Sequence, residues 1–194
     1  MKSAAEKLEA LKKEFGSEAI VASGEFRGES WLTVSLEKLK ELLRFSKESL
    51  GFDYLIDVSS VDHYESEPRF EMVYELYGME HHLHLRVKAL VSEDQEVPTV
   101  CDIWPTANWH EREIYDMMGI RFDGHPDLRR ILMWEGYPFY PLRKEFPLAG
   151  KESEMPEVAF TGIAPLEGGP FVTSPMDANT IEREPRAKSF DQEG

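Results

Sequence analysis

The sequence has one cysteine, Cys101, among 194 residues. A lone cysteine cannot form an internal disulfide, and by itself it cannot hold an iron–sulfur cluster, which takes several thiolates. Apolar runs are also missing: the longest are a few residues, far short of the roughly 20 that a membrane helix needs. The first residues mix Glu and Lys, unlike a secretory signal or a transit peptide. These absences together predict a cytosolic location.

Positive charge is scarce as well. The chain has 22 Lys and Arg against 37 Asp and Glu, a net charge of −15. This balance argues against a nucleic-acid partner and against direct binding to anionic lipid, since both need a cationic face. A hydrophobic share of 41% is typical of a globular protein, and the length allows one buried domain with an additional arm or tail.

Hydrophobic periodicity predicts an α+β fold, with a mixed, largely antiparallel sheet of about five strands and two or three packed helices. Ser3 and Glu6 have the spacing of a capping box before a first helix that ends at Gly16. Ser35 precedes a second helix with a leucine stripe, which Gly51 ends. Five segments have β-branched or alternating apolar residues typical of strands: 19–23, 30–34, 54–61, 69–77 and 81–91.

The last two of these segments predict a hairpin. Their outward side chains have opposite charge and should pair across the strands. They are Glu71 and Glu75 on one side, and His82, His84, Arg86 and Lys88 on the other. His81, His82 and His84 also suggest a metal site, but no nearby acidic or cysteine ligand completes a recognisable set, so a solvated strand face is favoured.

The stretch 108–147 concentrates charged and aromatic residues, a composition typical of contact surfaces. Asn108, or alternatively Thr106, should begin a third helix, Trp109–Met118, that Gly119 ends. We divide the chain into a globular domain at 1–118, an ordered irregular docking arm at 119–147 and an extended tail at 148–194. The tail has four Lys and Arg against nine Asp and Glu, and we expect it to lie along a partner.

Two chemical interpretations of this stretch compete with a structural one. Glu111 and Glu113 could be paired carboxylates, but helical spacing puts them on different faces. Arg112 and Asp116, at i and i+4, should pair with each other. His125 could be a base, although a histidine between Gly and Pro is more often a turn residue whose ring bonds backbone carbonyls. The basic residues of the arm suggest a buried or interfacial ion network; they are Arg129, Arg130, Arg143 and Lys144.

The run Glu111-Arg112-Glu113 with Asp116, followed by His125 and Arg129, resembles the signature of the C subunit of the proton-pumping NADH:quinone oxidoreductase, respiratory complex I. The segment PLRKEFPL after it is similar too. The resemblance is strong over 52–148 and weaker before it. A link rich in aromatics and proline, EGYPFYPLRK, departs from the pattern.

The resemblance implies a non-catalytic protein of the hydrophilic arm, on the cytoplasmic side of the cell membrane. It would bind no cofactor, with FMN, Fe–S clusters and quinone in partner subunits, and it would pack beside the D subunit and near the B, G and I subunits. The signature would form the partner interface, with no catalytic, cofactor or metal residue in the chain. The implied interface residues are Glu111, Arg112, Glu113, Asp116, His125, Arg129, Arg143 and Lys144.

Two alternatives remain open from the sequence. The chain could be the equivalent subunit of a membrane-bound hydrogenase or of a ferredoxin-fed quinone reductase, because the electron donor would bind elsewhere. It could also be a stand-alone enzyme that uses His125 with Glu111 or Asp116 as acid and base.

Overall fold

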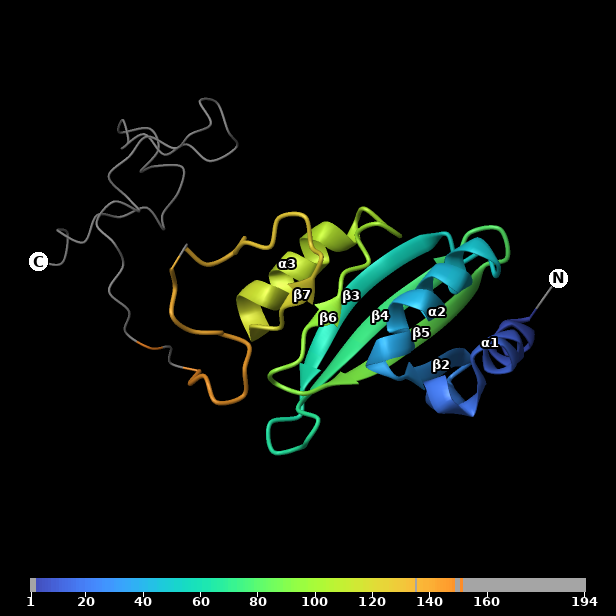
Figure 1. Ribbon diagram of the computed structural model, residues 1–194, viewed down its shortest axis with the longest axis horizontal. Coiled ribbons are helices and arrows are strands. Elements are labelled where there is room, and N and C mark those ends of the chain that lie inside the picture. Colours follow the sequence, from blue (N-terminus) through green and yellow to red (C-terminus); the bar gives the residue numbers. More distant parts are fainter. Residues whose placement is uncertain (1–2, 135, 149–150, 152–194) are drawn as a thin grey trace, which may run out of the picture. The chain divides into compact units, whose positions relative to one another are not determined.

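A five-stranded sheet with the order β1-β2-β5-β4-β3 forms the centre of the computed structural model (Figure 1). The structure describes residues 3–134, 136–148 and 151. The strands are β1 Ile20–Phe26, β2 Glu29–Val34, β3 Tyr54–Asp62, β4 Phe70–Gly78 and β5 Leu83–Val91. Three neighbouring pairs are antiparallel, and β2 with β5 is parallel. The expected mixed, largely antiparallel α+β fold is confirmed.

Alternation of apolar and polar residues explains which face of the sheet is buried. Phe70 pairs with Val91 and Met72 with Ala89 in the β4–β5 register, and all four side chains are buried. Helix α1, Ala4–Ala19, and helix α2, Leu36–Glu48, cover this face and bury their leucines against it. Among the described residues, no helix is long and apolar enough to cross a membrane.

Two helix ends differ from the sequence prediction. Gly16 does not end α1: it interrupts the helix with φ of 70°, and one more turn follows before β1. Helix α2 ends at Glu48, with Ser49 as its C-cap, and so stops before the expected Gly51. Gly51 instead takes a positive φ in the turn that leads to β3.

The two serine caps allow a matched test. Ser3 accepts a hydrogen bond from the Glu6 N–H, and Glu6 accepts one from the Ser3 N–H, whereas the Ser35 side chain makes no capping bond. We expect Ser3→Ala to reduce the free energy of unfolding by about 1 kcal/mol and Ser35→Ala to have a much smaller effect. Urea denaturation of the full chain measures both. Equal losses would show that the capping box does not stabilise α1.

The outer face of the β4–β5 hairpin has the expected ion pairs. Glu71 pairs with Lys88, and Glu75 pairs with both Arg86 and His84. The prediction was wrong for His82, which lies in the turn at φ of 52°, with Nδ1 3.0 Å from the Tyr77 hydroxyl. Since β5 begins only at Leu83, His82 and His84 do not share a strand face, and that chelating pair does not form.

Helix α3, Ala107–Met118, packs beside β3 (Figure 1). It begins at Thr106, the alternative cap, and ends at Gly119 with φ of 78° as predicted. The chain after it is irregular except for β7, Phe122–Asp123, which pairs in parallel with β6, Val97–Pro98. The boundaries at 118 and 147 stay predictions, and residues 152–194 of the expected tail lie outside the described part of the chain.

Candidate interaction site

The signature residues on α3 divide between the interior and the surface. The Glu111 and Asp116 side chains are both 0% exposed, and Glu113 is exposed, so the two glutamates do lie on different faces. The predicted Arg112–Asp116 pair was wrong. Asp116 binds Arg130 Nη1 at 2.6 Å, and Arg112 Nε donates to the Arg129 carbonyl at 3.1 Å. The i, i+4 rule applies to free helix surfaces, whereas here the arm covers this side of α3 and supplies other partners.

Asp116 attaches the arm to α3. Its Oδ2 accepts the backbone N–H groups of Ile131, Leu132 and Met133 at 3.0, 2.6 and 2.9 Å. Burial acts to raise the pKa of Asp116, but these bonds and Arg130 outweigh it and lower the pKa below its usual value. The irregular segment 131–133 has no strand or helix partner for these N–H groups, so the carboxylate satisfies them.

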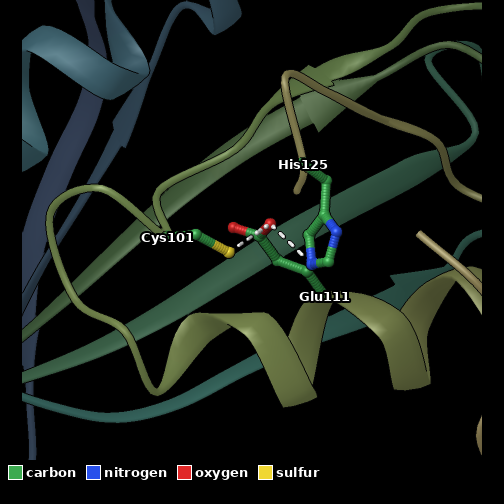
Figure 2. A group of neighbouring side chains, drawn as sticks. All are labelled: Cys101, Glu111 and His125. Atoms are coloured by element: carbon green, nitrogen blue, oxygen red, sulfur yellow. Dashed lines mark hydrogen bonds and ion pairs between the residues drawn. The ribbon is translucent and has the colours of Figure 1, made fainter. Parts of the chain in front are cut away.

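Glu111 binds the segment that precedes α3, and Figure 2 shows its contact with Cys101 of that segment. Thr99 Oγ1 donates to its Oε2 at 2.5 Å, the Val100 N–H to its Oε1 at 2.8 Å, and Cys101 Sγ to Oε2 at 3.4 Å. Burial raises the pKa of Glu111, and the hydrogen bonds from Thr99 and Val100 offset the rise only in part. The carboxylate therefore holds residues 99–101 against the helix.

His125 points toward Glu111 (Figure 2), with its Nε2 3.9 Å from Oε2 and its side chain fully buried. Nδ1 accepts the Asp127 N–H at 3.0 Å, so we assign the proton to Nε2, which donates to the Asn108 carbonyl at 3.2 Å. Both ring nitrogens are thus engaged with backbone groups. This confirms the interpretation of His125 as a turn residue and disfavours a role as an acid–base group.

Cys101, Glu111 and His125 form a possible metal-binding group that the sequence did not indicate, with ligand atoms all within 4.8 Å of one another. A metal at Nε2 would require the ring proton to move to Nδ1, where it would face the Asp127 N–H. The thiol and the carboxylate are already hydrogen-bonded to each other. The geometry therefore favours a hydrogen-bonded cluster over a metal centre.

Cys101 should react slowly in the folded chain. Burial first, and then the charge of Glu111, raise the pKa of its thiol from 9.0 to about 11. At pH 8 the thiolate fraction then falls roughly 100-fold, and alkylation should slow by a similar factor. Iodoacetamide labelling followed by mass spectrometry measures this, and because the chain has one cysteine the signal has a single source. The same labelling in urea is the control, and equal rates would contradict the expectation.

A second buried ion network attaches the end of the arm to the sheet. Arg69 binds Asp62 through Nε and Nη2, each at 2.9 Å, and Asp62 also accepts the Lys144 N–H at 2.9 Å. Arg69 also pairs with Glu93 and Glu145, and Arg143 pairs with Glu93. The Arg69 guanidinium holds the pKa of Asp62 well below its usual range. Of the basic residues expected in an ion network, Arg143 takes part through its side chain, whereas Lys144 takes part only through its backbone N–H. Asp62 and Arg69 were missed because nothing in the sequence pairs them with the arm.

The outward side of α3 and the arm is aromatic, apolar and cationic. Trp109 is 64% exposed, and Leu132 and Leu142 are also exposed. Trp109, Arg112, Arg129, Arg130 and Ile131 line an open cavity of about 310 Å³. Of the expected interface residues, Glu113, Arg129 and Lys144 reach the surface, and Arg112 lines the cavity. The side chains of Glu111, Asp116 and His125 are fully buried, and Arg143 is largely buried, so these four support the surface from within.

Comparison with known proteins shows which family the chain belongs to. The family model of the 30 kDa subunit of respiratory-chain NADH dehydrogenase matches residues 32–152. The chain is 46% identical over 162 residues to the NADH-quinone oxidoreductase C 2 subunit of Rhizobium meliloti, covering 82% of this chain and 88% of the relative. It is 47% identical over 146 residues to the C subunit of Geobacter sulfurreducens, covering 74% and 90%.

Two further matches link the chain to larger assemblies. It is 45% identical over 152 residues to the NADH-quinone oxidoreductase C/D 2 subunit of Aquifex aeolicus, covering 78% of this chain and 25% of the relative. The structure of the membrane-bound sulfane sulfur reductase, an archaeal respiratory membrane complex, has a similar chain. Its TM-score is 0.65 and its identity 27%, covering 74% of this chain and 85% of that one. The chain therefore belongs to the 30 kDa subunit family of respiratory-chain NADH dehydrogenase, the family of the NADH-quinone oxidoreductase C subunits.

Proposed function

We propose that the chain is a structural, non-catalytic subunit in the hydrophilic arm of a proton-translocating NADH:quinone oxidoreductase. It keeps neighbouring subunits in fixed positions, on the cytoplasmic side of the membrane. FMN, Fe–S clusters and quinone bind to the partner subunits, and none binds to this chain. The family match over 32–152 is the observation that carries the proposal.

The internal bonds of the arm support a positioning role. Asp116, Glu111 and Asp62 each accept backbone N–H groups from segments outside the regular elements. An irregular surface held by such bonds presents its side chains in one geometry, which lowers the entropy cost of docking. Transfer of electrons between centres needs fixed separations, so a protein can be required for it without holding a centre itself.

The D subunit is the first partner that we propose. The relative in Aquifex aeolicus carries both letters, C/D, in its name, which supports the view that the two proteins lie side by side in the complex. The cluster-bearing B, G and I subunits complete the proposed set of neighbours. The resemblance of the signature supports these three.

A second candidate is the equivalent subunit of another membrane-bound respiratory complex, such as a hydrogenase or a ferredoxin-fed quinone reductase. The fold shared with a chain of the sulfane sulfur reductase complex favours it. The two candidates differ in the electron-input subunits that accompany the chain, so identifying those subunits distinguishes them.

Affinity purification from gently solubilised membranes tests the proposal. A tagged full chain should recover the D, B, G and I subunits together with a flavin-containing NADH-oxidising module, and the iron and FMN should be found in those partners. Recovery with a hydrogenase or ferredoxin-oxidising module would support the second candidate. Recovery of a lone chain that holds its own cofactor and turns over a substrate would refute both.

A further inference from the structure

Arg112 is a nearly buried cation without a counterion. It is 7% exposed, its Nε donates to the Arg129 carbonyl, and its guanidinium lies 5.0 Å from the centre of the Trp109 ring. Within the described part of the chain, no carboxylate pairs with it and neither of its terminal nitrogens has a hydrogen-bond acceptor. Its terminal nitrogens are not fully buried, because they open onto the cavity that Arg112 lines. A guanidinium held in place by its neighbours, with unused donors that face a cavity, is suited to receive an anion.

The neighbouring arginines are already neutralised. Arg130 binds Asp116, and Arg129, whose side chain is 70% exposed, binds Asp127 at 2.9 Å. The uncompensated charge at the 310 Å³ cavity is thus that of Arg112. This uncompensated positive charge lies in a chain whose net charge is −15.

The shape and lining of the cavity indicate the class of ligand. A planar guanidinium pairs with a carboxylate through two parallel hydrogen bonds, and it does so best where water is excluded. The Trp109 ring and Ile131 provide apolar walls for the methylene groups of an acidic side chain. Trp and Arg are both enriched among the few residues that carry most of the binding energy of protein interfaces.

We propose that the Arg112 cavity binds the carboxylate of an Asp or Glu side chain that a neighbouring subunit inserts between Trp109 and Arg129. The inference rests on the proposed function, because it needs a partner subunit on this face of α3. A membrane phosphate is disfavoured as the occupant, because the strongly negative chain would be repelled from an anionic surface.

Dissociation of the assembled complex tests the proposal. The tagged full chain is immobilised with its partners, and the loss of partner subunits is followed during washing. Arg112→Gln should speed dissociation roughly 30-fold, since the inserted carboxylate is left buried and unpaired. Arg129→Gln, at an exposed position, should give a smaller increase. Arg27→Gln removes an exposed arginine in the turn between β1 and β2 and should leave the rate unchanged.

Arg112→Lys identifies the occupant. This variant keeps the charge and places a primary amine in the cavity, and a carbodiimide condenses that amine with an adjacent carboxylate into an amide. Mass spectrometry should find the link to an Asp or Glu of another subunit. A link to residues 152–194 of the same chain, or no link in an intact complex, would overturn the proposal. Thermal denaturation of each full-chain variant alone shows whether it is folded. If Arg112→Gln does not fold, the cross-link of Arg112→Lys tests the proposal instead.

The outcomes separate the inference from the proposed function. If the unaltered chain retains its partners and Arg112→Gln retains them equally long, the carboxylate site is refuted and the structural role stands. If the unaltered chain recovers no partner subunits, the proposed function fails and the inference fails with it.

Discussion

Replacing Asp116 by Ala is expected to lower the free energy of unfolding by roughly 3–5 kcal/mol. The change removes the acceptor for the N–H groups of Ile131, Leu132 and Met133, and leaves the Arg130 guanidinium without its carboxylate. Each buried donor without a partner costs about 1–3 kcal/mol, although the three losses will not add in full because the arm can move toward water. Urea denaturation of the full chain, followed by tryptophan fluorescence, gives the value.

Asp127→Ala is the matched control for Asp116. It removes the same side chain type from an ion pair with the adjacent Arg129, but both partners are more than half exposed. An exposed pair is worth less than about 1 kcal/mol, so the control should lose little stability. Equal losses in the two variants would show that Asp116 does not hold the arm in place.

Replacing Arg69 by Met should also cost roughly 3–5 kcal/mol, because the Asp62 carboxylate would stay buried without its bidentate partner. The pH dependence should change as well. Arg69 depresses the pKa of Asp62, so this pair contributes stability above the ordinary Asp pKa of about 4, and the contribution is lost as the pH falls. Arg69→Met should therefore flatten the loss of stability on acidification.

Urea denaturation at a series of pH values between 7 and 3 measures both effects. Arg44→Met is the control, since Arg44 forms an exposed pair with Asp102 on the surface of α2 and should contribute less than about 1 kcal/mol. A variant at Arg69 that is as stable as the unaltered chain at pH 7 would contradict the role given to the network.

Local patterns predicted the elements of this fold well. Alternation over 69–77 and 81–91 identified the buried face of the hairpin, and Gly119 marked the end of α3. The parallel pairing of β2 with β5 had no such signal, because two strands separated by a helix and two further strands share no pattern in the sequence. His82 was misplaced because the alternation continues by one residue into the turn.

The sequence identified the stretch whose charged and aromatic residues form the site, but it did not predict which of these residues bind one another. Arg112 and Asp116 have ideal spacing for a helix pair, but the arm offers each of them a different partner. The sequence did not show that Glu111 and Asp116 are buried. They are buried because irregular segments bring backbone N–H groups that need acceptors. Asp62 ends β3 and Arg69 directly precedes β4, and the contact of Asp62 with Lys144 spans 82 residues, beyond any local rule.

Hydrogen exchange of the full chain, alone and within the purified complex, shows whether the chain acts through the face that α3 and the arm present to neighbouring subunits. We expect assembly to slow exchange at residues 109–112 and 128–134, while the amides of β4 and β5 change little. Unchanged exchange in both segments of an intact complex would contradict this expectation.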